Sequence, residues 1–198
     1  MKNLFTLLLA GLIFIVISCN SDKKTVSTES TAKEDTVSIF PVTDFLTGQL
    51  RELDSMPVTV LRTVTVNGKT DSTWLKRESI RLFASPFLSQ VIDSASVSSY
   101  FSAKSFLDQT INAFTLTYDA NNNLPDSITL HHWSVYIDPQ TSQVQRIYLV
   151  KENTKDNEGV TTQLTWKVNQ WCSIRTITEK PGNAPTIREE KLTWDFNN

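Results

Sequence analysis

Glycine is scarce in this chain, with five residues out of 198, and that scarcity narrows the chemistry available to it. Phosphate-binding loops need closely spaced glycines so that backbone N–H groups can approach the ligand. Neither a Walker loop nor a Gly-x-Gly-x-x-Gly segment occurs. The Gly-x-Ser-x-Gly turn, which presents the serine nucleophile of α/β-hydrolases, is also missing. The sequence therefore contains no motif for nucleotide binding or for that class of hydrolase.

Histidine is even scarcer, and the only two residues, His131 and His132, are adjacent. They fall in a predicted strand, where neighbouring side chains point to opposite faces of a sheet. Two histidines so placed do not readily chelate one metal ion, and no Cys, Asp or Glu stands at a metal-ligand spacing from them. We predict no metal, cofactor or catalytic residue, although scattered carboxylates could still meet in three dimensions. These are Asp126, Asp138 and Asp195, at predicted strand ends and turns where Asp is expected for conformational reasons.

Charge of one sign is not in excess either. Nineteen Lys and Arg residues stand against 21 Asp and Glu residues, a net charge of −2, and the two signs are interspersed. A nucleic-acid-binding protein carries a basic patch or a basic excess. The sequence therefore predicts no nucleic-acid partner.

One long apolar run is present, at the start of the chain. Lys2 precedes an uncharged, mostly apolar run over 4–17, and polar residues follow from Asn20. Runs of about 10–14 apolar residues are more typical of signal peptides than of membrane-spanning helices, which need about 20. A charged start, an apolar centre and a small residue at the cut predict a secretory signal peptide over residues 1–18.

The end of this run, Val16-Ile17-Ser18-Cys19, resembles the lipobox of Gram-negative bacterial lipoproteins. The resemblance implies cleavage between Ser18 and Cys19 and lipidation of Cys19, for example with palmitate. Because Asn20 rather than Asp follows, it also implies the outer membrane, with the protein facing the periplasm or the cell surface. Two or three acyl chains on one residue suffice for stable anchoring, so the membrane is a predicted partner. An ordinary signal-peptide cut at the same bond would instead leave Cys19 as a free thiol.

The segment that follows the predicted anchor is poor in apolar residues. Residues 20–38 contain no aromatic residue, no Leu and no Ile, so they cannot bury enough apolar surface to offset the entropy lost on ordering. We predict a flexible, lipid-anchored tether over 19–38. The remainder, 39–198, has the length of a single globular domain with its own core.

The first part of this domain mixes helical and strand patterns. Leu46, Leu50 and Leu53 follow the four-and-three spacing of one helix face. Asn67-Gly68 between two extended segments is the strongest short-range hairpin signal. The pattern predicts, in order, a helix that ends before Pro57, hairpin strands over 58–66 and 70–75, and short helices over 78–88 and 97–107.

From residue 113 onward, polar and apolar side chains alternate as in half-buried strands. A Leu-Thr-aromatic core recurs at Leu116, Leu164 and Leu192. Its unequal spacing favours inward-facing side chains over a repeated ligand-binding unit. Strands are predicted over 113–118, 128–137, 144–150, 163–168, 171–178 and 187–196, with a polar turn over 153–159. The class is α+β: a large twisted antiparallel sheet, made of a hairpin and a meander, with two or three N-terminal helices on one face.

The contexts of Cys172 and of the strand tryptophans indicate a role in packing rather than in catalysis. If Cys19 is acylated, Cys172 has no partner in the chain and is expected to be a small buried hydrophobe. A Cys19–Cys172 disulfide is the alternative. Four tryptophans lie in predicted strands and either pack in the core or line an apolar groove. They are Trp133, Trp166, Trp171 and Trp194.

The sequence thus predicts a lipid-anchored envelope lipoprotein that is not an enzyme and that binds a partner protein or an apolar ligand. The element order and leader loosely resemble envelope lipoproteins whose open half-barrels hold acyl chains, although no motif carries that resemblance. Two alternatives stay open: an envelope hydrolase with an unrecognised site, and a structural accessory of an outer-membrane complex.

Overall fold

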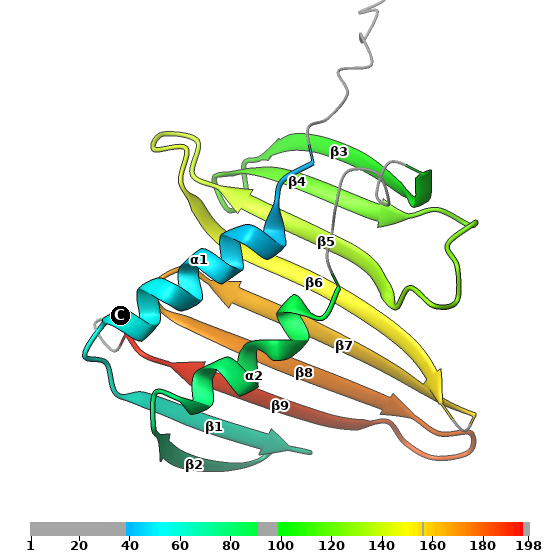
Figure 1. Ribbon diagram of the computed structural model, residues 1–198. Helices are drawn as coiled ribbons and strands as arrows, with labels where there is room; N and C mark the ends of the chain where they lie inside the picture. Colours follow the sequence, from blue (N-terminus) through cyan, green and yellow to red (C-terminus); the bar gives the residue numbers. More distant parts are fainter. Residues whose placement is uncertain (1–38, 91–98, 156, 196–198) are drawn as a thin grey trace, which may run out of the picture. The chain divides into compact units, whose positions relative to one another are not determined.

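A computed structural model describes residues 39–90, 99–155 and 157–195. These residues form one nine-stranded antiparallel sheet and two helices that lie across the same face of it (Figure 1). The helices are α1 (Val42–Ser55) and α2 (Ser79–Leu88). The strands are β1 (Val60–Val66), β2 (Lys69–Leu75), β3 (Phe101–Asp108), β4 (Ala113–Ala120), β5 (Leu130–Ile137), β6 (Val144–Lys155), β7 (Glu158–Lys167), β8 (Trp171–Glu179) and β9 (Thr186–Thr193).

Strands β3 to β9 follow one another as a meander, and the β1–β2 hairpin joins the sheet by pairing β1 with β9. Strands β2 and β3 are therefore the two edges of the sheet. Asn67 and Gly68 form the β1–β2 turn with φ angles of 47° and 83°, a conformation that Asn and Gly tolerate better than other residues. The predicted α+β class with a large antiparallel sheet is confirmed.

Two of the predicted elements were wrong. Residues 97–107 were expected to form a helix, but β3 occupies Phe101–Asp108 and pairs with β4 over its whole length. The hydrogen bonds of this pairing stabilise the strand, and the local sequence pattern does not reveal them. The polar segment 153–159 was expected to be a turn. Instead Asn153 and Thr154 continue β6 and pair with β7, because the end of a hairpin reaching into solvent needs no apolar side chains. Helix α2 follows the β1–β2 hairpin, so only α1 precedes the first strand.

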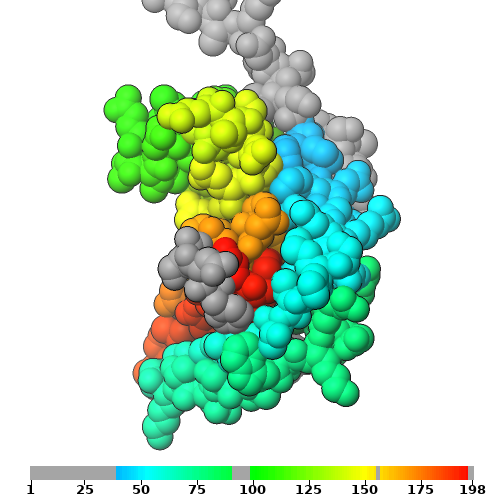
Figure 2. All heavy atoms as spheres, turned by 90° about the vertical axis from the view of Figure 1, so that its left-hand side faces the viewer, coloured from blue at the N-terminus to red at the C-terminus, as the bar shows by residue number. Residues whose placement is uncertain are grey.

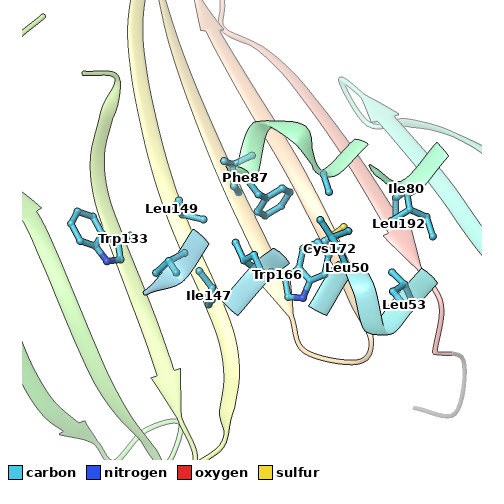
Figure 3. Close-up of a cluster of buried hydrophobic side chains, with 14 of the residues drawn as sticks. Leu50, Leu53, Ile80, Phe87, Trp133, Ile147, Leu149, Trp166, Cys172 and Leu192 are labelled. Atoms are coloured by element: carbon cyan, nitrogen blue, oxygen red, sulfur yellow. The ribbon is translucent and has the colours of Figure 1, made fainter. Parts of the chain in front are cut away.

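The core lies between the two helices and the facing side of the sheet, which we call the inner face. Figure 3 shows Leu50 and Leu53 of α1 and Phe87 of α2 among the side chains of the strands. The rings of Phe87 and Trp166 meet edge to face, with centroids 5.6 Å apart. In the last two Leu-Thr-aromatic segments both apolar residues are buried, as predicted for inward-facing side chains: Leu164, Trp166, Leu192 and Trp194.

Polar contacts also tie the helices to the sheet. The Lys151 ammonium of β6 donates to the carbonyl of Pro86 and to the Ser89 hydroxyl, both at 2.6 Å. These acceptors lie at the C-terminal end of α2, where the helix dipole stabilises a cation. Burial lowers the pKa of Lys151. Near the start of α1, the Phe40 N–H donates to the Tyr118 hydroxyl at 3.2 Å. Hydrogen bonds thus hold both α1 and α2, which together we call the helix layer, against the sheet.

Candidate functional site

The predicted cleavage and lipidation residues, Ser18 and Cys19, lie outside the described residues, and both assignments stay predictions. Neither helix in the described part of the chain is long and apolar enough to cross a membrane. Among the residues that the structure describes, no three His, Cys, Asp or Glu side chains are grouped so that they could hold a metal ion.

The two histidines depart from simple strand alternation. The β5–β6 register shifts between Leu130 and His132, which makes His131 the extra residue of a β-bulge. His131 Nδ1 lies 3.7 Å from Glu152 Oε2, and His132 Nδ1 lies 2.7 Å from Asp119 Oδ1. Alternation along β6 and β4 places both carboxylates on the side of the sheet away from the helices, which we call the outer face. The prediction that the imidazoles point to opposite faces was therefore wrong.

His132 belongs to a chain of hydrogen bonds that sequence reasoning missed. Its Nδ1 contacts Asp119, and its Nε2 lies 2.9 Å from the Ser134 hydroxyl. The Ser134 oxygen is in turn 2.8 Å from the Thr117 hydroxyl. An Asp–His–Ser order is that of a hydrolase triad. The spacing of residues 132 and 134 on one strand was the only signal for it in the sequence.

The surroundings of Ser134 argue against a nucleophile. The residue is only 2% exposed, so a substrate cannot reach its hydroxyl. Strand β5 pairs with β4 on one side and β6 on the other, which engages the backbone N–H groups that an oxyanion hole would need. Thr117 also shares the hydroxyl. The chain of bonds satisfies hydroxyl groups that would otherwise be buried without partners.

A cavity of about 660 Å³ adjoins the other histidine. Its lining includes Asp126, His131, Glu152 and Glu179. Small-molecule sites are mostly apolar with a few polar groups, whereas this lining is largely polar and acidic. The cavity does not suit an apolar ligand. The other two predicted carboxylates lie elsewhere, since Asp138 accepts hydrogen bonds from the Gln140 and Thr141 N–H groups and the Asp195 N–H donates to the Gln170 carbonyl.

Tryptophan and cysteine serve mainly as packing. Trp133, Trp166 and Trp194 are buried in the core, whereas Trp171 lies on the outer face beneath the Lys191 ammonium, 4.4 Å from the ring centroid. Cys172 is fully buried, as expected for a small hydrophobe, and burial raises the pKa of its thiol.

Exposed apolar side chains gather on the β3–β4 hairpin. Of the seven large apolar side chains that stand exposed in the described residues, four belong to it: Phe106 (48%), Leu107 (52%), Ile111 (44%) and Phe114 (38%). Leu107 and Phe114 are direct cross-strand partners on the inner face, whereas Phe106, the neighbour of Leu107, points to the outer face. Figure 2 shows the hairpin (green) and α1 (cyan) on opposite sides of the view, so α1 does not cover it. We call these four residues the hairpin patch.

The patch lies at one of the two edges of the sheet. Each edge strand carries two charged residues, but β2 exposes one large apolar side chain, Trp74 (61%), whereas the β3–β4 hairpin exposes four. The one cation of β3, Lys104, lies 3.9 Å from Asp119 of the neighbouring strand β4. Its charge is therefore partly neutralised and protects the edge less than an unpaired lysine would. Exposed apolar edge strands are templates for pairing with another chain, and charged residues normally prevent this. The β3 edge is the candidate functional site.

No family model matches this chain, and no curated protein matches it either. The candidate site therefore rests on its geometry.

Proposed function

We propose that this protein is a non-enzymatic, lipid-anchored envelope lipoprotein that binds a partner protein along the edge strand β3. The observation that carries the proposal is the hairpin patch on a sheet edge with which no further described strand pairs. The anchor rests on Val16-Ile17-Ser18-Cys19 and its resemblance to a lipobox.

The chemistry of the edge favours a polypeptide over a lipid. An edge strand presents unpaired backbone N–H and C=O groups beside its side chains. Hydrocarbon cannot satisfy such groups, and open sheet edges are not found in contact with lipid tails. An extended segment of a partner satisfies them by adding a strand, while its side chains contact Leu107 and Phe114.

The inner face offers less to an apolar ligand. Its centre is filled by helix side chains, and Leu46, Ile80 and Phe87 are at most 2% exposed. An acyl chain could enter there only if α1 or α2 left the sheet, and departure of α2 would also break its contacts with Lys151. Partner binding at the edge requires no such rearrangement.

A tether would assist the encounter. A flexible segment of about 20 residues has a root-mean-square span of roughly 25 Å. Holding the domain within that distance of the membrane raises its effective concentration toward partners in the same membrane.

Site-specific photo-crosslinking in cells tests the proposal. A photoreactive amino acid replaces Leu107 in the full chain, and the matched control places it at Leu82, which is 80% exposed on α2. We expect one discrete protein adduct from position 107 and none from position 82. Phe114→Asp should reduce that adduct at least about tenfold without changing the urea unfolding midpoint.

The same experiment can contradict the proposal. Adducts that are identical from positions 107 and 82, or an adduct with lipid alone at position 107, would exclude a protein partner on the β3 edge. Cys19→Ser separates the two halves of the proposal, because it removes the anchor and leaves the edge strand intact.

A further inference from the structure

Three cations stand together on the outer face of the sheet, next to two aromatic rings. Tyr136, Arg146, Lys167 and Trp171 occupy one row of directly opposed residues across β5, β6, β7 and β8. Lys191 of β9 lies one row further along, opposite Ser173. We call the five residues Tyr136, Arg146, Lys167, Trp171 and Lys191 the cationic strip. With strands about 4.8 Å apart, its cations span roughly 14 Å across the sheet.

The strip is only partly balanced by nearby carboxylates: Glu189 stands two residues from Lys191 on the same face of β9, and Asp138 lines the same hollow as Lys167. Arg146 and Lys167 are direct cross-strand partners, and like charges in that arrangement destabilise a sheet. None of the ion pairs among the described residues includes Arg146, Lys167 or Lys191. Cations that repel one another and form no close ion pair among the described residues are suited to an external anion.

Aromatic rings hold two of the cations in place. The Arg146 guanidinium carbon lies 3.9 Å from the centroid of the Tyr136 ring, and the Lys191 ammonium lies 4.4 Å from that of Trp171. Such cation–π contacts restrain long side chains that would otherwise sample many rotamers. The positive charges are therefore presented at fixed positions on the sheet.

We propose that the cationic strip docks this protein on an anionic membrane surface by binding the phosphate groups of lipid headgroups. Tyr and Trp are the side chains enriched at membrane–water interfaces, and Lys and Arg near an anionic leaflet are attracted to its surface. Glu152 and Glu179 lie on the same face toward the other strand ends, so the leaflet attracts one end of the face and repels the other. The inference goes beyond partner binding and uses a surface distinct from the hairpin patch.

Lysine acetylation in vesicles tests docking while the full chain stays attached. The protein is reconstituted into vesicles of phosphatidylcholine alone or with one third phosphatidylglycerol, and acetylation of each lysine is measured by mass spectrometry. We expect Lys167 and Lys191 to react at least about fivefold more slowly in the anionic vesicles, and high salt to abolish the difference. Lys69, on the far edge strand β2, should react equally in both.

A charge-matched pair of variants locates the effect. Arg146→Gln should reduce the protection of Lys191 about fivefold, the contribution of one basic residue at an anionic surface. Arg188→Gln, which removes the same charge from a residue paired with Glu190, should leave it unchanged. Equal reactivity in the two vesicle types would overturn the proposal. So would protection by soluble dextran sulfate that matches the protection by vesicles, because it would assign the strip to an acidic polymer. Both outcomes are independent of a protein partner at β3.

Discussion

Replacement of Phe87 by Ala should loosen the helix layer from the sheet. Phe87 is 2% exposed, and its ring packs edge to face against Trp166. Truncation of a buried Phe costs about 3–5 kcal/mol, and an aromatic pair accounts for about 0.5–1.5 kcal/mol of that. Since α2 is short and contains Pro86, it has few other ways to compensate. We expect a loss of about 4 kcal/mol in the free energy of unfolding.

Urea unfolding followed by tryptophan fluorescence measures this loss. With a slope of about 2 kcal/mol per molar urea, the midpoint should fall by about 2 M. Leu82→Ala on the same helix is the matched control, because Leu82 is 80% exposed and its truncation should cost less than about 0.5 kcal/mol. The slope should be the same in all three proteins.

A midpoint shift below about 0.5 M for Phe87→Ala would refute this reasoning. It would mean that α2 contributes little to the core and can leave the sheet at low cost. The inner face would then be accessible, and binding of an apolar ligand beneath the helices would be favoured over binding of a partner at the edge.

Three further predictions concern buried or half-buried polar and ionisable groups. Burial alone would raise the pKa of Glu190, but hydrogen bonds from Arg62 and Arg188 outweigh it and lower the pKa. Ionised Glu190 therefore stabilises the fold above its ordinary pKa of about 4.3, and this stabilisation is lost as the pH falls through the lowered pKa of the folded state. The urea midpoint should fall less steeply with decreasing pH in Glu190→Gln than in the unmodified protein. An equally steep fall in both would contradict this. Ser134→Ala should cost about 1–3 kcal/mol in urea because its buried hydrogen-bond partners lose a contact, while any ester hydrolysis by the purified protein stays the same; loss of hydrolysis would restore the hydrolase hypothesis. Because burial raises the pKa of the Cys172 thiol, the acylated mature protein should expose one thiol to Ellman's reagent, and only after denaturation; a thiol that reacts in the native state would contradict the packing.

Features fixed by neighbouring residues could be predicted from the sequence. The Asn67-Gly68 turn depends on the positive φ that these two residues tolerate. The core face of α1 depends on the spacing of four and three residues among Leu46, Leu50 and Leu53. Each signal lies within a few residues. The corresponding hairpin and helix appear at the expected positions.

Features that depend on distant pairing could not be predicted. The pairing of β1 with β9 joins residues more than 120 positions apart, and no local pattern encodes it. Phe101 and Leu107 fit either a helix or a strand, and pairing with β4 decides between them. The hairpin patch was missed for a related reason: Phe106 and Phe114 are apolar, and apolar residues are expected in a core. Phe114 is exposed because the helices do not extend over the β3–β4 hairpin, and Phe106 is exposed because strand alternation turns it to the outer face. Only the folded arrangement sets both.

Amide hydrogen exchange in β3 tests the central claim most directly. Once the partner crosslinked from position 107 is purified, exchange is compared in the free protein and in the complex. Strand addition predicts that every second amide of Phe101–Asp108, namely those facing away from β4, exchanges at least about tenfold more slowly in the complex. The amides of the opposite edge strand β2 should be unaffected. Unchanged exchange throughout β3, with protection elsewhere, would contradict binding at this edge.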